Sequence, residues 1–181
     1  MLDLEVLQYL QEFKVVDTET LTTLFYKNKK YAQRRLLKLY KEREVDRERD
    51  HINQQYRYWI KGSKPKQMKH SILRTRFHAK LSDIVKIEFF KPAFKLFNII
   101  PDGFLVFKKN GYFYSNFIEI QLSPNSDIDK YKHLFHSKLW QKRFNGVFPR
   151  VVFITNQSMD DEQDFTLIQV KEDLTDIHRI L

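Results

Sequence analysis

The sequence of 181 residues contains no cysteine, only four glycines and five prolines, and each scarcity excludes a class of protein. Without cysteine the chain cannot form disulfides, thiolate zinc sites or a cysteine nucleophile. So little glycine and proline excludes collagen-like and low-complexity architectures. No apolar run approaches the roughly 20 residues that span a bilayer, and the start, MLDLEVLQYL, lacks the basic region and cleavage site of a signal peptide. We therefore expect a soluble, cytoplasmic protein with no membrane partner.

Charge and apolar residues, by contrast, are plentiful. Hydrophobic residues make up 42% of the chain, enough for a buried core, and the formal net charge is +9. The basic excess is concentrated in residues 61–100, with ten Lys or Arg against two Asp or Glu, and in residues 27–43, with eight basic residues against one acid. Such clusters attract polyanions because bound phosphates release their condensed counterions. Ordinary solvated helix faces are the alternative interpretation.

Three short helices and a hairpin are predicted in the first sixty residues. Apolar residues at helical spacing predict a helix over residues 2–13, Asp17 or Thr18 can cap a second helix, and Asn28 can cap a third over residues 29–42. Two alternating segments, 44–49 and 55–60, flank a polar turn and predict a β-hairpin. This order is typical of a winged helix-turn-helix domain, which we assign to residues 1–62.

In that fold the third helix enters the DNA major groove, so double-stranded DNA is the predicted partner. Amide and guanidinium groups can pair with base edges, ammonium groups can contact phosphates, and hairpin arginines can reach the flanking backbone. Residues 61–80 add seven basic side chains and no acid, which extends the predicted surface. The alternative is a small helical module for protein contacts. The predicted DNA-binding residues are Lys29, Lys30, Gln33, Arg34, Lys38, Arg47, Arg49, Arg57, Lys64, Lys66 and Lys69.

A second domain is predicted over residues 67–181, after a linker-like segment, KGSKPK, at 61–66. The apolar pattern predicts a helix over 67–85, strands over 86–90, 102–107 and 112–122, a helix over 126–142, strands over 151–155 and 165–170, and a closing helix over 172–181. Asn110-Gly111 is a strong turn signal between the second and third of these strands. The second domain is therefore predicted to be an α/β sandwich with a mixed sheet, which makes the whole chain α+β or α/β.

Two acids flank that turn at equal distances. Asp102 and Glu119 each lie about eight residues from Asn110-Gly111, so they can meet across antiparallel strands. Two carboxylates suit Mg²⁺ or Mn²⁺, which can activate water and stabilise the charge that develops in phosphodiester cleavage. Because a buried carboxylate without a partner is costly, a functional pair is favoured over two ordinary strand-end acids. We predict a metal site at Asp102 and Glu119, with Mg²⁺ as the cofactor.

An acid, a second acid and a third position two residues later resemble the motif of the PD-(D/E)xK nuclease superfamily. The superfamily's Lys corresponds to Gln121 here, which can neither carry a positive charge nor deprotonate water. Some members show the same E-x-Q pattern, and in others a Lys from the next helix takes over, which implies Lys130 or Lys132 as a further catalytic residue. Weaker candidates for an additional ligand, base or acid are His70, His78 and Asp83.

Short motifs along the chain carry a second resemblance: Leu7-x-x-Leu10, Thr18-Glu19-Thr20-Leu21, Arg34-Arg35-Leu36-Leu37-x-Leu39-Tyr40, Tyr56-x-Tyr58, His70, Ile100-Pro101-Asp102-Gly103 and Phe117-Ile118-Glu119-Ile120. With them the chain resembles the replication-relaxation family of plasmids and integrative elements over nearly its whole length. The resemblance implies a DNA-binding winged helix fused to a restriction-endonuclease-like domain, associated with plasmid replication or transfer, and it suggests replication or transfer proteins as partners. A glycine common at the end of the family's third helix is absent, and Glu42-Arg43 stand in its place.

Three functions are compatible with these features. The first is a DNA-binding accessory protein of a plasmid or mobile element, acting in replication, relaxation or transfer with an inactive nuclease-like domain. The second is a Mg²⁺-dependent DNA endonuclease or nickase that uses Asp102 and Glu119. The third is an interaction or homodimerisation module, for which Trp140, Phe144 and Phe148 would form an exposed aromatic surface.

Overall fold

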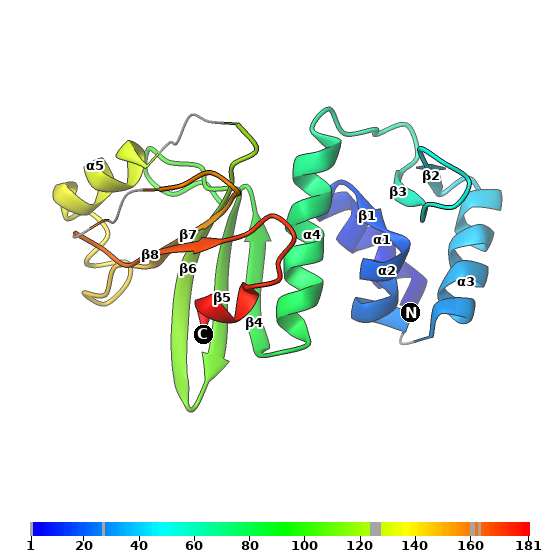
Figure 1. The fold of residues 1–181 in the computed structure, drawn as a ribbon. Coiled ribbons are helices and arrows are strands. Elements are labelled where there is room, and N and C mark those ends of the chain that lie inside the picture. Colours follow the sequence, from blue (N-terminus) through cyan, green and yellow to red (C-terminus); the bar gives the residue numbers. More distant parts are fainter. Residues whose placement is uncertain (1, 27, 124–127, 160–161, 163) are drawn as a thin grey trace. The chain divides into compact units, whose positions relative to one another are not determined.

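The computed structural model describes residues 2–26, 28–123, 128–159, 162 and 164–181. The chain divides into two compact units, Met1–Asp83 and Ile84–Leu181. Both contain helices and a β-sheet, so the fold is mixed α+β, with one three-stranded and one five-stranded sheet (Figure 1). Among the described residues, no helix combines the length and the apolar character that a membrane crossing requires.

The N-terminal unit has the element order that its sequence predicts, followed by a long helix. Its elements are α1 (Leu2–Phe13), β1 (Val16–Asp17), α2 (Thr18–Leu21), the π-helical turn η1 (Thr22–Tyr26), α3 (Lys29–Lys41), β2 (Val45–Glu48), β3 (Arg57–Ile60) and α4 (Met68–Ser82). The three short strands form an antiparallel sheet in the order β1-β3-β2. Its core is built from fully buried residues of several helices, including Leu10, Leu21, Leu36, Phe77 and Leu81.

Side-chain caps fix where the helices of this unit begin. The Asp17 carboxylate accepts a hydrogen bond from the Thr20 backbone N–H at 2.9 Å, and the Asn28 side chain accepts one from the Tyr31 N–H at 3.0 Å. At the end of α3, Arg43 has φ 63°. This left-handed conformation favours glycine, and Arg43 adopts it directly after the helix ends.

The long helix α4 packs within the N-terminal unit, against β1, α2 and η1. Arg74 is buried and donates from Nη2 to the Phe13 carbonyl at 3.1 Å, while Arg76 Nε donates to Asp17 Oδ2 at 2.6 Å. These contacts explain why the compact units separate at Asp83–Ile84, whereas the sequence led us to expect a boundary at 62–66. The composition of residues 61–66 correctly indicates a loop, but that loop lies inside the unit.

The C-terminal unit is built on a mixed sheet, as predicted. Its elements are β4 (Lys86–Pro92), β5 (Gly103–Lys109), β6 (Tyr112–Ile120), α5 (Asp129–Ser137), β7 (Arg150–Ile154), β8 (Leu167–Val170) and the 3₁₀ turn η2 (Ile177–Ile180). The strand order is β4-β5-β6-β7-β8, with antiparallel pairing from β4 to β6 and parallel pairing from β6 to β8. The parallel step from β6 to β7 requires a crossover, which contains α5.

Two helices of this unit are shorter than predicted. The helix expected over 126–142 ends at Ser137, because Lys138 has φ 58° and leaves the helical region. The positions at which we expected it to begin, Ser126 and Asp127, lie outside the described residues. The closing helix expected over 172–181 is a single 3₁₀ turn, preceded by Leu174 with φ 59°.

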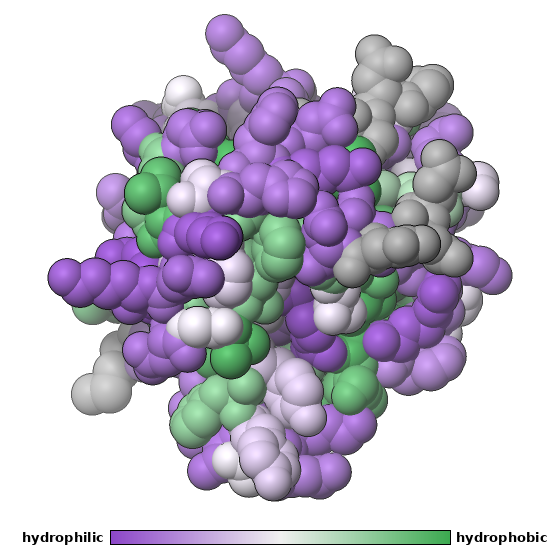
Figure 2. Space-filling model, turned by 90° about the vertical axis from the view of Figure 1, so that its left-hand side faces the viewer, coloured by the Kyte–Doolittle hydropathy of each residue, from purple (hydrophilic) through white to green (hydrophobic). Residues whose placement is uncertain are grey.

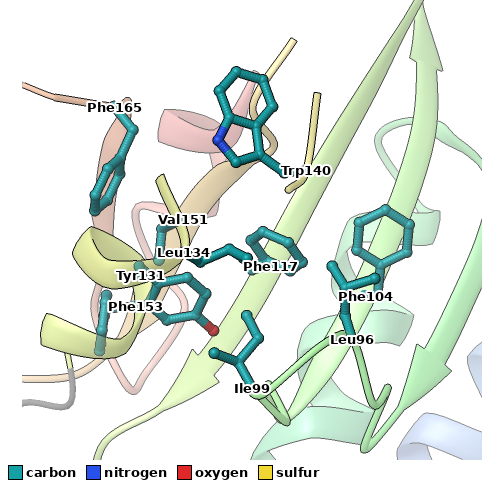
Figure 3. Packing of buried hydrophobic residues seen from close by; sticks show 10 residues of the cluster. All are labelled: Leu96, Ile99, Phe104, Phe117, Tyr131, Leu134, Trp140, Val151, Phe153 and Phe165. Atoms are coloured by element: carbon teal, nitrogen blue, oxygen red, sulfur yellow. The ribbon is translucent and has the colours of Figure 1, made fainter. Parts of the chain in front are cut away.

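An aromatic-rich core fills the space between α5 and the sheet (Figure 3). Its buried residues are Leu96, Ile99, Phe104, Phe117, Tyr131, Leu134, Trp140, Val151, Phe153 and Phe165. Trp140 is 7% exposed and donates from Nε1 to the Phe135 carbonyl at 2.9 Å, and Phe144 and Phe148 pack against the same core. The predicted exposed aromatic surface of these three residues is therefore wrong, because the sheet offers more apolar surface than the short α5 can cover.

Candidate functional sites

The first candidate site lies where β5 begins and β6 ends. The register pairs Gly103 with Ile118, so Asp102 and Glu119 come to neighbouring positions of adjacent strands. The backbone N–H of Ile120 donates to Asp102 Oδ2 at 2.8 Å, which holds the carboxylate against β6. The two acids that the turn spacing singles out are thus brought together.

Helix α5 supplies the partners of Glu119. Lys130 Nζ lies 2.8 Å from Glu119 Oε1, and the Tyr131 hydroxyl donates to the same oxygen. Lys132 is paired with Glu162 instead, at 3.1 Å. Of the two lysines that the sequence left open, Lys130 is therefore the one at the acid. Tyr131 escaped the sequence analysis because its position on the apolar stripe of α5 indicated only a core residue.

Burial dominates the electrostatics of Glu119, which is 8% exposed. It raises the pKa of Glu119 to about 7, and the negative charge of Asp102 contributes to the rise. Hydrogen bonds from Lys130 and Tyr131 act in the opposite direction because they stabilise the ionised form. The pKa of Glu119 therefore lies near neutral pH, chiefly because the carboxylate is buried and secondly because Asp102 is beside it.

Gln121, two residues after Glu119, has an unsatisfied acceptor. The residue is 8% exposed, and its Oε1 atom has no hydrogen-bond partner in the part of the chain that the structure describes. Its backbone N–H donates to the Ile154 carbonyl at 3.0 Å, and strand alternation puts its side chain on the same face as that of Glu119. A buried amide oxygen without a donor costs about 1 to 3 kcal/mol, so it needs an explanation. Carboxylate and amide oxygens are ligands of hard divalent cations.

The other predicted contributors to this site belong to the N-terminal unit. His78 is on α4, where its Nδ1 lies 2.8 Å from the Tyr9 hydroxyl and burial lowers its pKa to about 4. His70 is in the first turn of α4, and Asp83 is the C-cap residue of that helix. Within the described residues, no cluster of three or more His, Cys, Asp or Glu side chains could hold a metal ion. The candidate oxygen donors are the carboxylates of Asp102 and Glu119, with the buried Gln121 amide two residues further along the chain.

The second candidate site is the polar side of α3. Ala32, Leu36 and Leu39 face the core. The five predicted DNA-binding side chains of this helix are all exposed, namely Lys29, Lys30, Gln33, Arg34 and Lys38. Three further apolar residues of this helix, Tyr31, Leu37 and Tyr40, are 38%, 37% and 42% exposed. The buried stripe of α3, which packs against α2, η1 and β2, therefore consists of Ala32, Leu36 and Leu39.

A groove of about 500 Å³ lies between α3 and the β2–β3 hairpin. It is lined by Thr18, Glu19, Lys29, Gln33, Leu37, Arg47, Arg49, Ile52, Asn53, Gln54, Gln55, Tyr56 and Tyr58. Four of the predicted DNA-binding residues are therefore gathered around one concavity. The side-chain amides of the hairpin loop were missed by the sequence analysis, although three consecutive amides in a turn, residues 53–55, are a visible signal.

Tyr56 organises the arginines of the groove. The Arg47 guanidinium lies 4.1 Å from the centre of the Tyr56 ring and 4.4 Å from that of Tyr40. The Arg49 guanidinium lies 4.6 Å from Tyr56, and its Nη1 donates to the Ile52 carbonyl at 2.7 Å. Stacking on aromatic rings fixes an arginine while leaving its charge uncompensated. Arg47 and Arg49 are thus preorganised cations.

Acids neutralise several other predicted cations. Arg57 pairs with Glu48 and Asp50, and Lys64 with Glu48, while Lys38 lies 3.5 Å from Glu42. Lys66 and Lys69 are exposed. In the segment 61–80, Arg74 is buried and Arg76 binds Asp17, so part of its basic charge serves the fold.

Comparisons of the chain with models of protein families, with curated proteins and with solved structures find no match.

Proposed function

We propose that the N-terminal unit binds double-stranded DNA through α3 and the β2–β3 hairpin. The observation that carries the proposal is the groove in which Lys29 and Gln33 of α3 face Arg47 and Arg49 of the hairpin. Such a groove presents cations for phosphates and an amide for base edges on one surface. The element order, with a hairpin after the third helix and a three-stranded sheet, supports a winged-helix assignment.

The side chains divide into roles by their partners. Gln33 and Arg34, both exposed on α3, are suited to reading base edges, and Lys29 and Lys30 to contacting phosphates. Arg47 and Arg49 are fixed by stacking and can grip the backbone beside the groove. Arg57 and Lys64 contribute least, because Glu48 and Asp50 already compensate their charges.

The salt dependence of binding to a duplex of random sequence tests this proposal. Lys29→Gln/Lys30→Gln should flatten the slope of log K against log salt by about 0.9 per lost phosphate contact. Arg57→Gln is the matched control and should change the slope less, since its charge is compensated by Glu48 and Asp50. Gln33→Ala/Arg34→Ala should change the sequences enriched from a randomised duplex library. Identical slopes and enriched sequences for all variants would contradict the proposal.

The resemblance to replication-relaxation proteins extends the proposal to a biological role. We infer an accessory function in the replication, relaxation or transfer of a plasmid or mobile element, with replication or transfer proteins as partners. Immunoprecipitation of the protein with its crosslinked DNA from cells should recover origin or transfer-region DNA of such an element. Recovery of DNA without any such enrichment would remove this role while leaving duplex binding intact.

A second candidate function is favoured by the Gln121 Oε1 atom. With Asp102 and Glu119 it would complete an oxygen donor set for Mg²⁺, in a domain whose three antiparallel strands, crossover helix and parallel strand support a nuclease-like assignment. A bound cation would supply a Lewis acid for phosphodiester cleavage. Lys130 would provide the positive charge that Gln121 lacks, from its position 2.8 Å from Glu119. This function is a Mg²⁺-dependent endonuclease or nickase.

Two measurements test the second candidate. Mn²⁺ titrated into the protein should release heat in the wild type and not in Asp102→Ala, and supercoiled plasmid should be nicked only with the cation. Lys130→Gln should reduce nicking strongly, while the matched control Lys132→Gln, whose partner is Glu162, should not. Nicking that persists in Asp102→Ala would assign it to a contaminant.

A further inference from the structure

One arm of the C-terminal sheet carries exposed aromatic rings. Strand β6 pairs with β7 only from Asn116 onward, so its first residues, 112–115, continue with β5 as an arm beyond the parallel part of the sheet (Figure 1). The turn at its tip is tight, because Asn110 has φ 51° and Gly111 has φ 85°. Figure 2 shows green and pale side chains among purple ones at the lower end of the molecule, where Figure 1 has the arm.

The residues on one face of this arm form a regular pattern. Across the three antiparallel strands, Lys86 is opposite Lys108, and Lys108 is opposite Phe113. Phe89 is opposite Val106, two residues before Lys108, and therefore shares their face. Phe113 is 65% exposed and Phe89 is 44% exposed. We call Lys86, Phe89, Lys108 and Phe113 the aromatic–lysine surface.

The aromatic–lysine surface carries two free-energy penalties when no ligand is bound to it. Lys86 and Lys108 are directly opposite each other in the sheet. Like charges in such a pair repel and are destabilising. Lys86 is partly relieved by Glu88 at 2.8 Å, and the Lys108 ammonium lies 5.4 Å from the centre of the Phe113 ring. The two phenylalanines keep large apolar areas in water. A ligand that offers both negative charge and flat apolar rings would remove both penalties.

We propose that the aromatic–lysine surface binds single-stranded nucleic acid. The unstacked bases of a single strand can stack on Phe113 and Phe89, and the phosphates of that strand can contact Lys86 and Lys108. A duplex keeps its bases inside the helix and has no flat face to offer along its side. The surface is independent of α3 and the β2–β3 hairpin, so it does not rest on the duplex-binding proposal.

Binding of the full chain to a fluorescein-labelled oligothymidylate, followed by anisotropy, tests the proposal. Phe113→Leu keeps an apolar side chain but removes the stacking ring, and should weaken binding about tenfold. Lys108→Gln should flatten the salt slope by about 0.7. The matched control is Tyr112→Ala, because Tyr112 is 72% exposed on the same arm but pairs with Lys109 on the opposite face. This variant should bind like the wild type.

Several outcomes would overturn the proposal. They are no binding of the oligothymidylate, equal binding by Phe113→Leu and wild type, or equal loss in Tyr112→Ala. Binding to anionic vesicles that Phe113→Leu abolishes, without oligothymidylate binding, would replace the nucleic acid by a membrane surface. Failure of the duplex proposal is distinguishable, since Lys29→Gln/Lys30→Gln should affect a duplex probe and leave the oligothymidylate bound. In a Trp59→Phe background, unchanged fluorescence of the buried Trp140 verifies that the C-terminal unit of each arm variant is folded.

Discussion

Asp17 and Glu119 are buried acids, one in each unit, and their surroundings differ in how fully the carboxylate charge is compensated. Asp17 accepts the capping hydrogen bond of Thr20 and the Nε–H of Arg76, so both carboxylate oxygens serve the fold. Glu119 is beside Asp102, and its pKa is raised to about 7 despite Lys130 and Tyr131. A buried acid with sufficient partners stabilises its surroundings, whereas a crowded pair retains a penalty that an additional ligand can relieve.

The two tryptophans of the sequence allow the units to be compared separately. Trp59, 4% exposed, belongs to the N-terminal unit, and Trp140, 7% exposed, to the C-terminal unit. In a Trp140→Phe background, fluorescence reports unfolding of the N-terminal unit, and in a Trp59→Phe background that of the C-terminal unit. Urea unfolding in these two backgrounds measures each of the following predictions.

The largest effect is expected for Asp17→Ala. It removes the cap of α2 and the anchor of Arg76, and should lower the free energy of unfolding of the N-terminal unit by about 3 to 4 kcal/mol. Asp17→Asn keeps an acceptor for the Thr20 N–H and should lose less. A loss confined to the C-terminal unit would contradict the assignment of α4 to the N-terminal unit.

A smaller effect is expected from pH on the N-terminal unit. Burial lowers the pKa of His78 from 6.5 to about 4, so between these values the unfolded chain binds the proton and the folded chain does not. The free energy of unfolding of the N-terminal unit should therefore be highest above pH 6.5 and fall by about 2 to 3 kcal/mol toward pH 4. His78→Gln, which can still bond to the Tyr9 hydroxyl, should remove most of this dependence. A profile that His78→Gln leaves unaltered would show that another group titrates.

An effect of similar size and opposite sign is expected in the C-terminal unit. Because the pKa of Glu119 is raised from 4.5 to about 7, the folded chain binds a proton that the unfolded chain has lost. Stability should be highest below pH 4.5 and fall by about 2 to 3 kcal/mol as the pH rises through 7. Glu119→Gln should abolish that fall, and unfolding curves at pH 5 and pH 8 measure it. If the variant is less stable than the wild type at pH 8, the ionised form is the stabilised one.

Much of the fold could be predicted because its signals are local. Helix α1 spans the predicted residues 2–13, and α3 ends one residue before the predicted end. The caps at Asp17 and Asn28 and the Asn110-Gly111 turn are read from a few neighbouring residues. The placement of α4 could not be predicted in this way, because Arg74 and Arg76 contact residues about sixty positions earlier in the chain.

In the candidate sites too, the features set by local sequence were predictable and those set by tertiary contacts were not. A two-residue turn fixes the register, so counting outward from it was enough to bring Asp102 and Glu119 together. The choice of Lys130 over Lys132 depends on where α5 begins and how it is rotated, which the apolar pattern leaves open by a residue or two. The stacking of Arg47 between Tyr40 and Tyr56 depends on the distance between helix and hairpin, a tertiary property.

The packing of α4 against β1, α2 and η1, with its ion pair between Asp17 and Arg76, also has a consequence for where the polypeptide can be divided into independent pieces. A fragment that started at residue 67, after the apparent linker, would carry away α4 with the apolar side chains of Ile72, Phe77 and Leu81 stripped of their surroundings. The remaining fragment, residues 1–66, would lose the contact between Arg74 and Phe13. We expect it to aggregate, because the apolar surface that α4 covers would be exposed. Cutting after Asp83 leaves each half with its own interior.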